Sequence, residues 1–145
     1  MKLSADPVFY CIIKYINRDT MRGEIIKGNQ ELGRWGEKVA MRFLEKGEYI
    51  ILERNVRTPY GEIDIVAKKD NRLFFVEVKT RSSMKFGNPE EAITETKILH
   101  MIESAQSFIQ EHSDFIGDWQ IDVIAVQVQS DDRLPKITHF KNAIS

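Results

Sequence analysis

The chain has 145 residues, of which 42% are hydrophobic and 30% charged, and its formal net charge is −1. This length predicts one domain, and this composition excludes a disordered chain. The near-zero charge excludes a polybasic nucleic-acid binder, so any nucleic-acid contact requires a local basic patch.

Cysteine and histidine usage narrows the chemistry further. The single cysteine, Cys11, excludes an internal disulfide framework, and the three histidines (His100, His112 and His139) lack the spacing of zinc ligands. The apolar run at residues 8–13 ends at Lys14 and is far shorter than the roughly 20 residues of a membrane span. No small-residue cleavage site follows it, so we expect a cytoplasmic protein without a membrane anchor.

The first part of the chain differs from the rest. Residues 1–28 carry the cysteine and a short aromatic run, and we expect them to form an extension outside the core, with the domain at 29–145. From Gln30 the apolar residues recur with helical spacing, and Gly36 and Ala40 are small enough to let this helix approach a sheet closely.

Strands follow this helix. Residues 49–52 predict a first strand, and residues 55–59 predict a loop, because Pro59 cannot occupy a central strand. Residues 62–67 and 73–79 predict two strands joined by a turn at 69–72, where Asp70 and Asn71 tolerate a left-handed backbone.

The second half repeats this mixture of elements. Asn88, Pro89 and two acidic residues are typical of a helix start, and an apolar stripe from Ile98 to Ile109 continues that helix. Residues 120–128 and 136–140 predict two more strands, with a turn at 131–132 between them. The order of elements predicts an α/β fold with a small mixed sheet.

Acidic residues lie within the predicted hairpin. A turn centred between Asp70 and Asn71 pairs Asp64 with Glu77 and Glu62 with Lys79, and two-residue periodicity places these four side chains on one face. Ile63, Ile65, Val76 and Val78 then point to the other face and into the core. A register slip of one residue would break this arrangement.

Two carboxylates opposite each other in apolar strands repel and are costly to desolvate. A shared proton, a basic side chain or a divalent cation would offset this cost, and carboxylate oxygens suit Mg²⁺ or Mn²⁺. Lys79 would orient an attacking water or stabilise charge on a phosphate. Asp64, Glu77 and Lys79 therefore point to phosphodiester hydrolysis, although on spacing alone a solvated face with surface ion pairs is the commoner explanation.

A basic stretch surrounds these acids. Residues 53–85 contain eight basic and five acidic side chains, which is compatible with a phosphate-binding rim or with an ordinary soluble surface. Arg54 and Arg57 belong to this rim. Arg81 would either hold a phosphate in a bidentate manner or pair with a surface acid, and Lys97 would face either the site or solvent.

The sequence resembles the bacterial YraN-like family from about Leu32 to Ala143. The resemblance rests on Gly33-x-x-Gly36-Glu37-x-x-Ala40, Arg54-Asn55-x-Arg57, Gly61-Glu62-Ile63-Asp64-Ile65-Val66, Phe75-Val76-Glu77-Val78-Lys79-Thr80-Arg81, Gly87-x-Pro89 and Lys97. That family is similar to the PD-(D/E)xK nuclease superfamily and, more distantly, to Holliday-junction resolvases.

This resemblance implies a restriction-endonuclease-like fold, in which helices flank a mixed central β-sheet. It implies that Asp64 and Glu77 bind Mg²⁺ or Mn²⁺, that the Val78 carbonyl is a further ligand, and that Lys79 is the catalytic lysine. Glu37 matches a supporting glutamate on the first helix, although an ordinary solvated position would also explain it. Two positions depart from the family pattern: Gln120 replaces a frequent arginine, and Ile144 replaces a frequent phenylalanine.

Three functions remain open from the sequence. The leading one is a metal-dependent nuclease that hydrolyses DNA, with branched DNA as one candidate substrate and nucleic-acid contacts at Arg54, Arg57, Arg81 and Lys97. The second is a non-catalytic nucleic-acid-binding module with the same fold, and the third is a structural protein whose acids are merely paired. Analogy with resolvases also suggests a homodimer.

Overall fold

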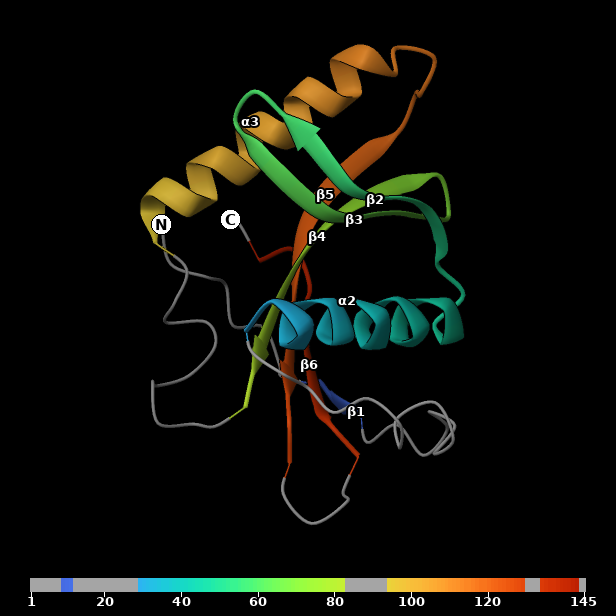
Figure 1. The fold of residues 1–145 in the computed structure, drawn as a ribbon. Coiled ribbons are helices and arrows are strands. Elements are labelled where there is room, and N and C mark those ends of the chain that lie inside the picture. Colours follow the sequence, from blue (N-terminus) through green and yellow to red (C-terminus); the bar gives the residue numbers. More distant parts are fainter. Residues whose placement is uncertain (1–8, 12–28, 83–93, 130–133, 144–145) are drawn as a thin grey trace.

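The computed structural model describes residues 9–11, 29–82, 94–129 and 134–143 (Figure 1). The predicted helix start at residues 88–91 and the predicted turn at 131–132 lie outside these ranges. The elements, in chain order, are β1 (Phe9–Cys11), α2 (Asn29–Lys46), β2 (Ile50–Thr58), β3 (Gly61–Lys69), β4 (Arg72–Arg81), α3 (Glu95–Glu111), β5 (Asp118–Gln127) and β6 (Lys136–Phe140).

The described strands form one mixed sheet in the order β1-β6-β5-β4-β3-β2. β4 and β5 are parallel and joined through α3, whereas every other neighbouring pair is antiparallel. The fold is therefore α/β with a mixed sheet, as the sequence predicts. β1 lies within residues 1–28 and adds an edge strand to this sheet by pairing with β6.

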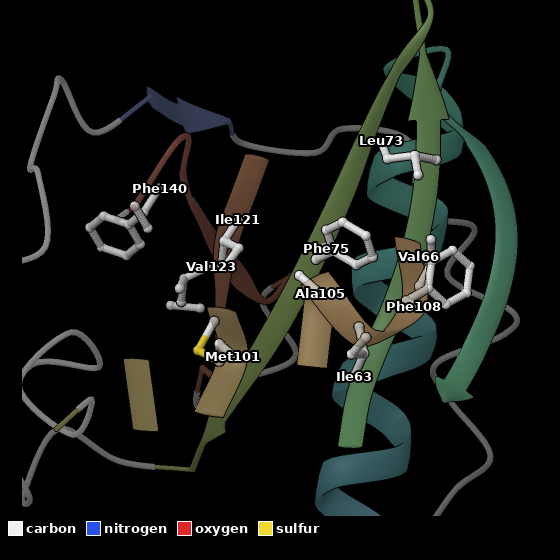
Figure 2. Packing of buried hydrophobic residues seen from close by; sticks show 12 residues of the cluster. Ile63, Val66, Leu73, Phe75, Met101, Ala105, Phe108, Ile121, Val123 and Phe140 are labelled. Carbon is white, nitrogen blue, oxygen red and sulfur yellow. The ribbon is translucent and has the colours of Figure 1, made fainter. Parts of the chain in front are cut away.

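The two helices cover opposite faces of the sheet, as alternation along β5 demonstrates. Ile124 and Val126 pack in one cluster with Leu44 of α2, whereas Val123 packs in a second cluster with Phe108 of α3. Figure 2 shows the α3 side chains directed at the strands in this second cluster. Within the described ranges, no helix is long and apolar enough to cross a membrane.

The central hairpin has the predicted register. Lys69 pairs with Arg72, and the ladder continues regularly to Ile65 opposite Val76. Asp70 and Asn71 have φ values of 51° and 57°, so both turn residues adopt the left-handed conformation that a two-residue hairpin turn requires.

The ladder ends at this last pair, one residue before Asp64 and Glu77. The predicted cross-strand pairs Asp64–Glu77 and Glu62–Lys79 therefore lie beyond the regular ladder, and the predicted alternation of side chains is wrong at Ile63. Ile65 and Val76 pack on the α2 side, but Ile63 packs on the α3 side. The alternation breaks next to Asp64, where β3 separates from β4.

One predicted boundary is also wrong. Residues 55–58 belong to β2 rather than to a loop, because β2 is an edge strand and Pro59 follows its last residue. The helix that carries the apolar stripe begins after Thr94, whose side chain caps it by accepting a hydrogen bond from the Lys97 amide.

Gly36 sets the distance between α2 and β4, as its size predicts. An added Cβ would collide with Thr80 Oγ1 and would lie 2.8 Å from both Thr80 Cβ and Thr80 Cγ2. Gly36→Ala gains about 1 kcal/mol in helix propensity but overpacks this contact, which costs about 1–3 kcal/mol. We expect a lower midpoint of thermal unfolding, followed by calorimetry, and partial recovery in the double variant with Thr80→Ala. A higher midpoint for Gly36→Ala alone would show that α2 is free to move.

Candidate active site

Asp64 supplies a hydrogen-bond acceptor for the backbone of β4 at the point where β3 and β4 separate. Its Oδ2 accepts a hydrogen bond of 2.8 Å from the amide of Val78 on β4, a group that a continued ladder would have paired with the β3 backbone. The carboxylate is largely buried between the two strands. Its role in the fold is thus to terminate the ladder, and this role fixes its position beside Glu77.

Glu77 is the more deeply buried carboxylate of the pair, with 7% of its side chain exposed. Two ammonium groups compensate it: Lys79 Nζ lies 3.6 Å and Lys97 Nζ lies 3.2 Å from Glu77 Oε1. The structure thus brings together the three predicted catalytic residues. It also brings Lys97, from α3, into the same cluster, while the predicted nucleic-acid contact of Lys97 stays a prediction.

A second pair of acids lies beside this one. Asn55 of β2 connects them, because its amide nitrogen, when oriented toward the carboxylates, donates to Glu62 Oε1 at 3.1 Å and to Glu37 Oε2 at 3.2 Å. Asn55 adopts φ 50°, which asparagine tolerates better than most residues. The sequence patterns assign no site role to Asn55, and to Glu62 only a pairing with Lys79. The motif Arg54-Asn55-x-Arg57 was the available signal for Asn55.

Burial and mutual repulsion raise the pKa values of two of these acids. Burial, followed by the charge of Glu77, raises the pKa of Asp64 to about 7, although the Val78 amide and Lys97 act in the opposite direction. Burial, followed by Glu62 and Glu77, also raises the pKa of Glu37. Since these charges act on one another, Glu37, Asp64 and Glu77 form one electrostatic unit, which we call the acidic cluster.

Arginines border the acidic cluster on the α2 and β2 side. Arg54 and Arg34 both lower the pKa of Glu37, and the Arg54 guanidinium lies 3.7 Å from Met41 Sδ. Arg57 lies opposite Glu62 in the register of β2 and β3. The sequence analysis did not identify Arg34, because its effect on Glu37 depends on where α2 crosses the sheet.

Arg81 is another of the predicted phosphate contacts. It ends β4 opposite Gln127 of β5. Within the described ranges, the charges that chiefly shift the pKa values of Asp64 and Glu37 belong to other side chains. The role of Arg81 as a nucleic-acid contact stays a prediction.

The donor atoms of the acidic cluster are all oxygens, which matches the preference of Mg²⁺ and Mn²⁺. Among the described residues, no three acidic, histidine or cysteine side chains converge closely enough to hold a metal ion by themselves. Mg²⁺ commonly uses only one or two carboxylates and completes its shell with water and substrate phosphate. Asp64 and Glu77, whose proximity raises the pKa of Asp64, fit that requirement.

A small pocket opens beside the acids, between the hairpin and α3. Its free volume of ≈ 10 Å³ admits about one water molecule. Two carboxylates lie at its edge and the remaining lining is mostly apolar; the lining residues are Glu62, Ile63, Phe75, Val76, Glu77, Met101 and Ile121.

Comparison with known proteins places the chain in a family. The model of the family described as "Uncharacterised protein family UPF0102" matches residues 36–126. A UPF0102 protein of Syntrophomonas wolfei is 45% identical over 115 residues, covering 79% of this chain and 98% of the relative. The chain belongs to the UPF0102 family. A UPF0102 protein of Geotalea daltonii is 41% identical over 123 residues, covering 85% of this chain and 96% of the relative.

The UPF0102 match covers the whole acidic cluster. It begins at Gly36, next to Glu37, and ends at Val126 near the end of β5, so that Asp64, Glu77 and Lys97 all lie inside it. β1 and β6 lie outside the matched range.

Proposed function

We propose that this UPF0102 protein is a metal-dependent nuclease that hydrolyses phosphodiester bonds in DNA. One observation carries the proposal: Glu37, Asp64 and Glu77 come from three different elements, are buried to different degrees, and act electrostatically on one another. Ordinary structural acids are rarely gathered in this way, because desolvation and repulsion both destabilise them.

Asp64 and Glu77 would hold Mg²⁺ or Mn²⁺, with the Val78 carbonyl as a further ligand and Glu37 in support. When bound, the cation would polarise a phosphoryl oxygen and lower the pKa of a bound water. Asp64 is suited to this role because the Val78 amide fixes one of its oxygens. Such fixation holds the carboxylate in place before any ligand arrives.

Lys79 would act on the reacting groups. Its ammonium lies 3.6 Å from Glu77, and its side chain is 31% exposed, so it is oriented by the carboxylate and still accessible to a substrate. From this position it would hold a water or stabilise charge on the phosphate. Arg54 and Arg57 would contact the DNA backbone beside the acids, because guanidinium groups bind phosphate oxygens well.

The order of residues supports a place in the PD-(D/E)xK superfamily. An aspartate on one strand is followed by Glu-x-Lys on the next antiparallel strand, and a helix contributes a glutamate beside them. We include in this proposal a cytoplasmic location, where bacterial DNA is found, and the homodimer that resolvase analogy suggests.

A cleavage assay tests this function. Purified protein is incubated with branched, single-stranded and duplex DNA in the presence of Mg²⁺ or Mn²⁺. We expect Asp64→Asn and Lys79→Ala to reduce cleavage by about a hundredfold or more, because each removes a group that acts in the transition state.

Lys68→Ala is the matched control, since it removes a lysine near the end of β3 that lies away from Asp64. It should cleave as the wild type does. If the wild-type protein cleaves no DNA, or if the variants cleave equally well, the protein is not a nuclease of this kind.

A non-catalytic nucleic-acid-binding module is the second candidate. The observation in its favour is that the acids already have partners without a metal, since Lys79 and Lys97 neutralise Glu77. This function predicts salt-sensitive binding to DNA that requires no divalent cation and survives Glu77→Gln. Fluorescence anisotropy at several salt concentrations, with and without EDTA, distinguishes it from the nuclease.

A further inference from the structure

Lys97 occupies a position in α3 that its own helix disfavours. Thr94 is the N-cap and Lys97 is the third residue of the helix, where glutamate or glutamine completes a capping box. A cation in the first turn also opposes the positive end of the helix dipole. A residue that contradicts the local preference indicates compensation elsewhere.

The compensating interaction is with Glu77 of β4. Lys97 Nζ is 3.2 Å from Glu77 Oε1, which is closer than Lys79 Nζ at 3.6 Å. The charge of Lys97 also lowers the pKa of Asp64, so it acts on both carboxylates that would hold a metal. Lys97 therefore occupies the electrostatic position that a bound cation would take.

The backbone of Lys97 is held in place, whereas its side chain can move. The backbone is fixed by the Thr94 cap and by Ile98, which is 2% exposed, whereas the Lys97 side chain is 37% exposed. A long, flexible side chain with solvent beside it can leave Glu77 without any movement of α3. Glu77 is 7% exposed and would then keep only Lys79, at the longer distance of 3.6 Å. A divalent cation in the place of Lys97 would restore the lost compensation.

We propose that Lys97 is a tethered counter-ion of the acidic cluster, which neutralises Glu77 in the absence of metal and is displaced when a divalent cation binds. Lys97 is thus a positioning residue that sets the cation affinity of the site. This inference rests on the proposed function, because it concerns the same carboxylates, but it makes a separate claim about competition.

Mn²⁺ binding to the full chain, measured by isothermal titration calorimetry, tests the proposal. Lys97→Gln removes the charge and places a favourable residue at the third helical position. We expect it to bind Mn²⁺ roughly tenfold more tightly than the wild type, because a competing positive charge beside Glu77 is gone. Lys97→Arg keeps the charge and should bind within about twofold of the wild type.

Lys68→Gln is the matched control, because it makes the same change in net charge near the end of β3 that lies away from Asp64. If it shifts the affinity as much as Lys97→Gln does, net charge alone is responsible and the proposal is wrong. The Mn²⁺-dependent rise in the thermal midpoint provides a second readout, which should be larger for Lys97→Gln than for the wild type. Lys97→Met serves as a second neutral variant if Lys97→Gln fails to fold.

The outcomes separate this inference from the nuclease proposal. If Lys97→Gln binds Mn²⁺ no more tightly than the wild type, the counter-ion role is wrong. If the wild type itself binds Mn²⁺, that result still supports the proposed metal site. Binding by the neutral variant alone supports the role in its strongest form. If neither the wild type nor any Lys97 variant binds Mn²⁺, the metal site and this inference both fail.

Discussion

Asp64→Asn is expected to raise the midpoint of thermal unfolding at pH 8 in the absence of divalent cations, by about 5–10 °C. The ionised Asp64 is destabilising there, because burial and Glu77 raise its pKa to about 7 from an ordinary value of 3.8. Asparagine removes the charge and keeps an oxygen that can accept the Val78 hydrogen bond. The expected gain is roughly 2–4 kcal/mol, which corresponds to a shift of this size in a domain of this length.

The same shift predicts how wild-type stability depends on pH. Between about pH 4 and pH 7 the folded protein keeps a proton on Asp64 that the unfolded chain releases. The free energy of unfolding therefore falls as pH rises through this window, and the full cost is present above the folded pKa. The raised pKa of Glu37 acts in the same direction. Urea unfolding across this range should show a difference between wild type and Asp64→Asn that is small near pH 4 and greatest at pH 8.

Glu77→Gln is the informative comparison for this prediction. Glu77 is partnered by two partly exposed ammonium groups, Lys79 and Lys97, so its removal leaves these without a counter-charge. We expect a midpoint no higher than that of the wild type. An equal rise for both variants would mean that general acidic repulsion, rather than the burial of Asp64, limits stability. A variant that is more stable and inactive would also show that Asp64 is retained for function.

The sequence was informative about the hairpin because its determinants are local. Asp70 and Asn71 specify the turn, and apolar residues on both strands leave few registers open. The pairing from Lys69 with Arg72 to Ile65 with Val76 follows from these facts. Local signals were therefore enough to predict the paired part of the hairpin, whereas the position of Asp64 beside Glu77 depends on the hydrogen bond that Asp64 accepts from the Val78 amide.

The end of that ladder was not predictable, because it depends on packing from both layers. Ile63 joins the α3 cluster although Ile65 joins the α2 cluster, and two-residue periodicity gives no sign of this change. The same limit applies to Lys97. Its helical position was visible, but its contact with Glu77 depends on where α3 rests against the sheet.

Asp122→Ala is expected to destabilise the protein by about 3–5 kcal/mol, because it breaks a buried network that joins β5, β6 and the residues after β6. Asp122 is 0% exposed. Its Oδ2 lies 2.8 Å from Nε2 of His139, and its Oδ1 accepts from the Gln120 side chain and from the Asn142 amide, each at 2.8 Å. Alanine would leave the buried His139 imidazole without this partner and would remove the acceptor of the two part-buried hydrogen bonds from Gln120 and Asn142.

Asp122→Asn distinguishes lost hydrogen bonds from lost charge. Its amide can still accept from the Asn142 amide and donate to His139 in the neutral form, so the loss should be less than half of that for alanine. Urea unfolding measures both variants, and a loss below about 1 kcal/mol for Asp122→Ala would contradict a structural role for this network.

Asp122 lies on β5 beside Val76 of β4, the residue that ends the regular hairpin ladder. A loosened β5 should therefore also weaken the site, so that Asp122→Ala reduces Mn²⁺ binding without removing any proposed ligand.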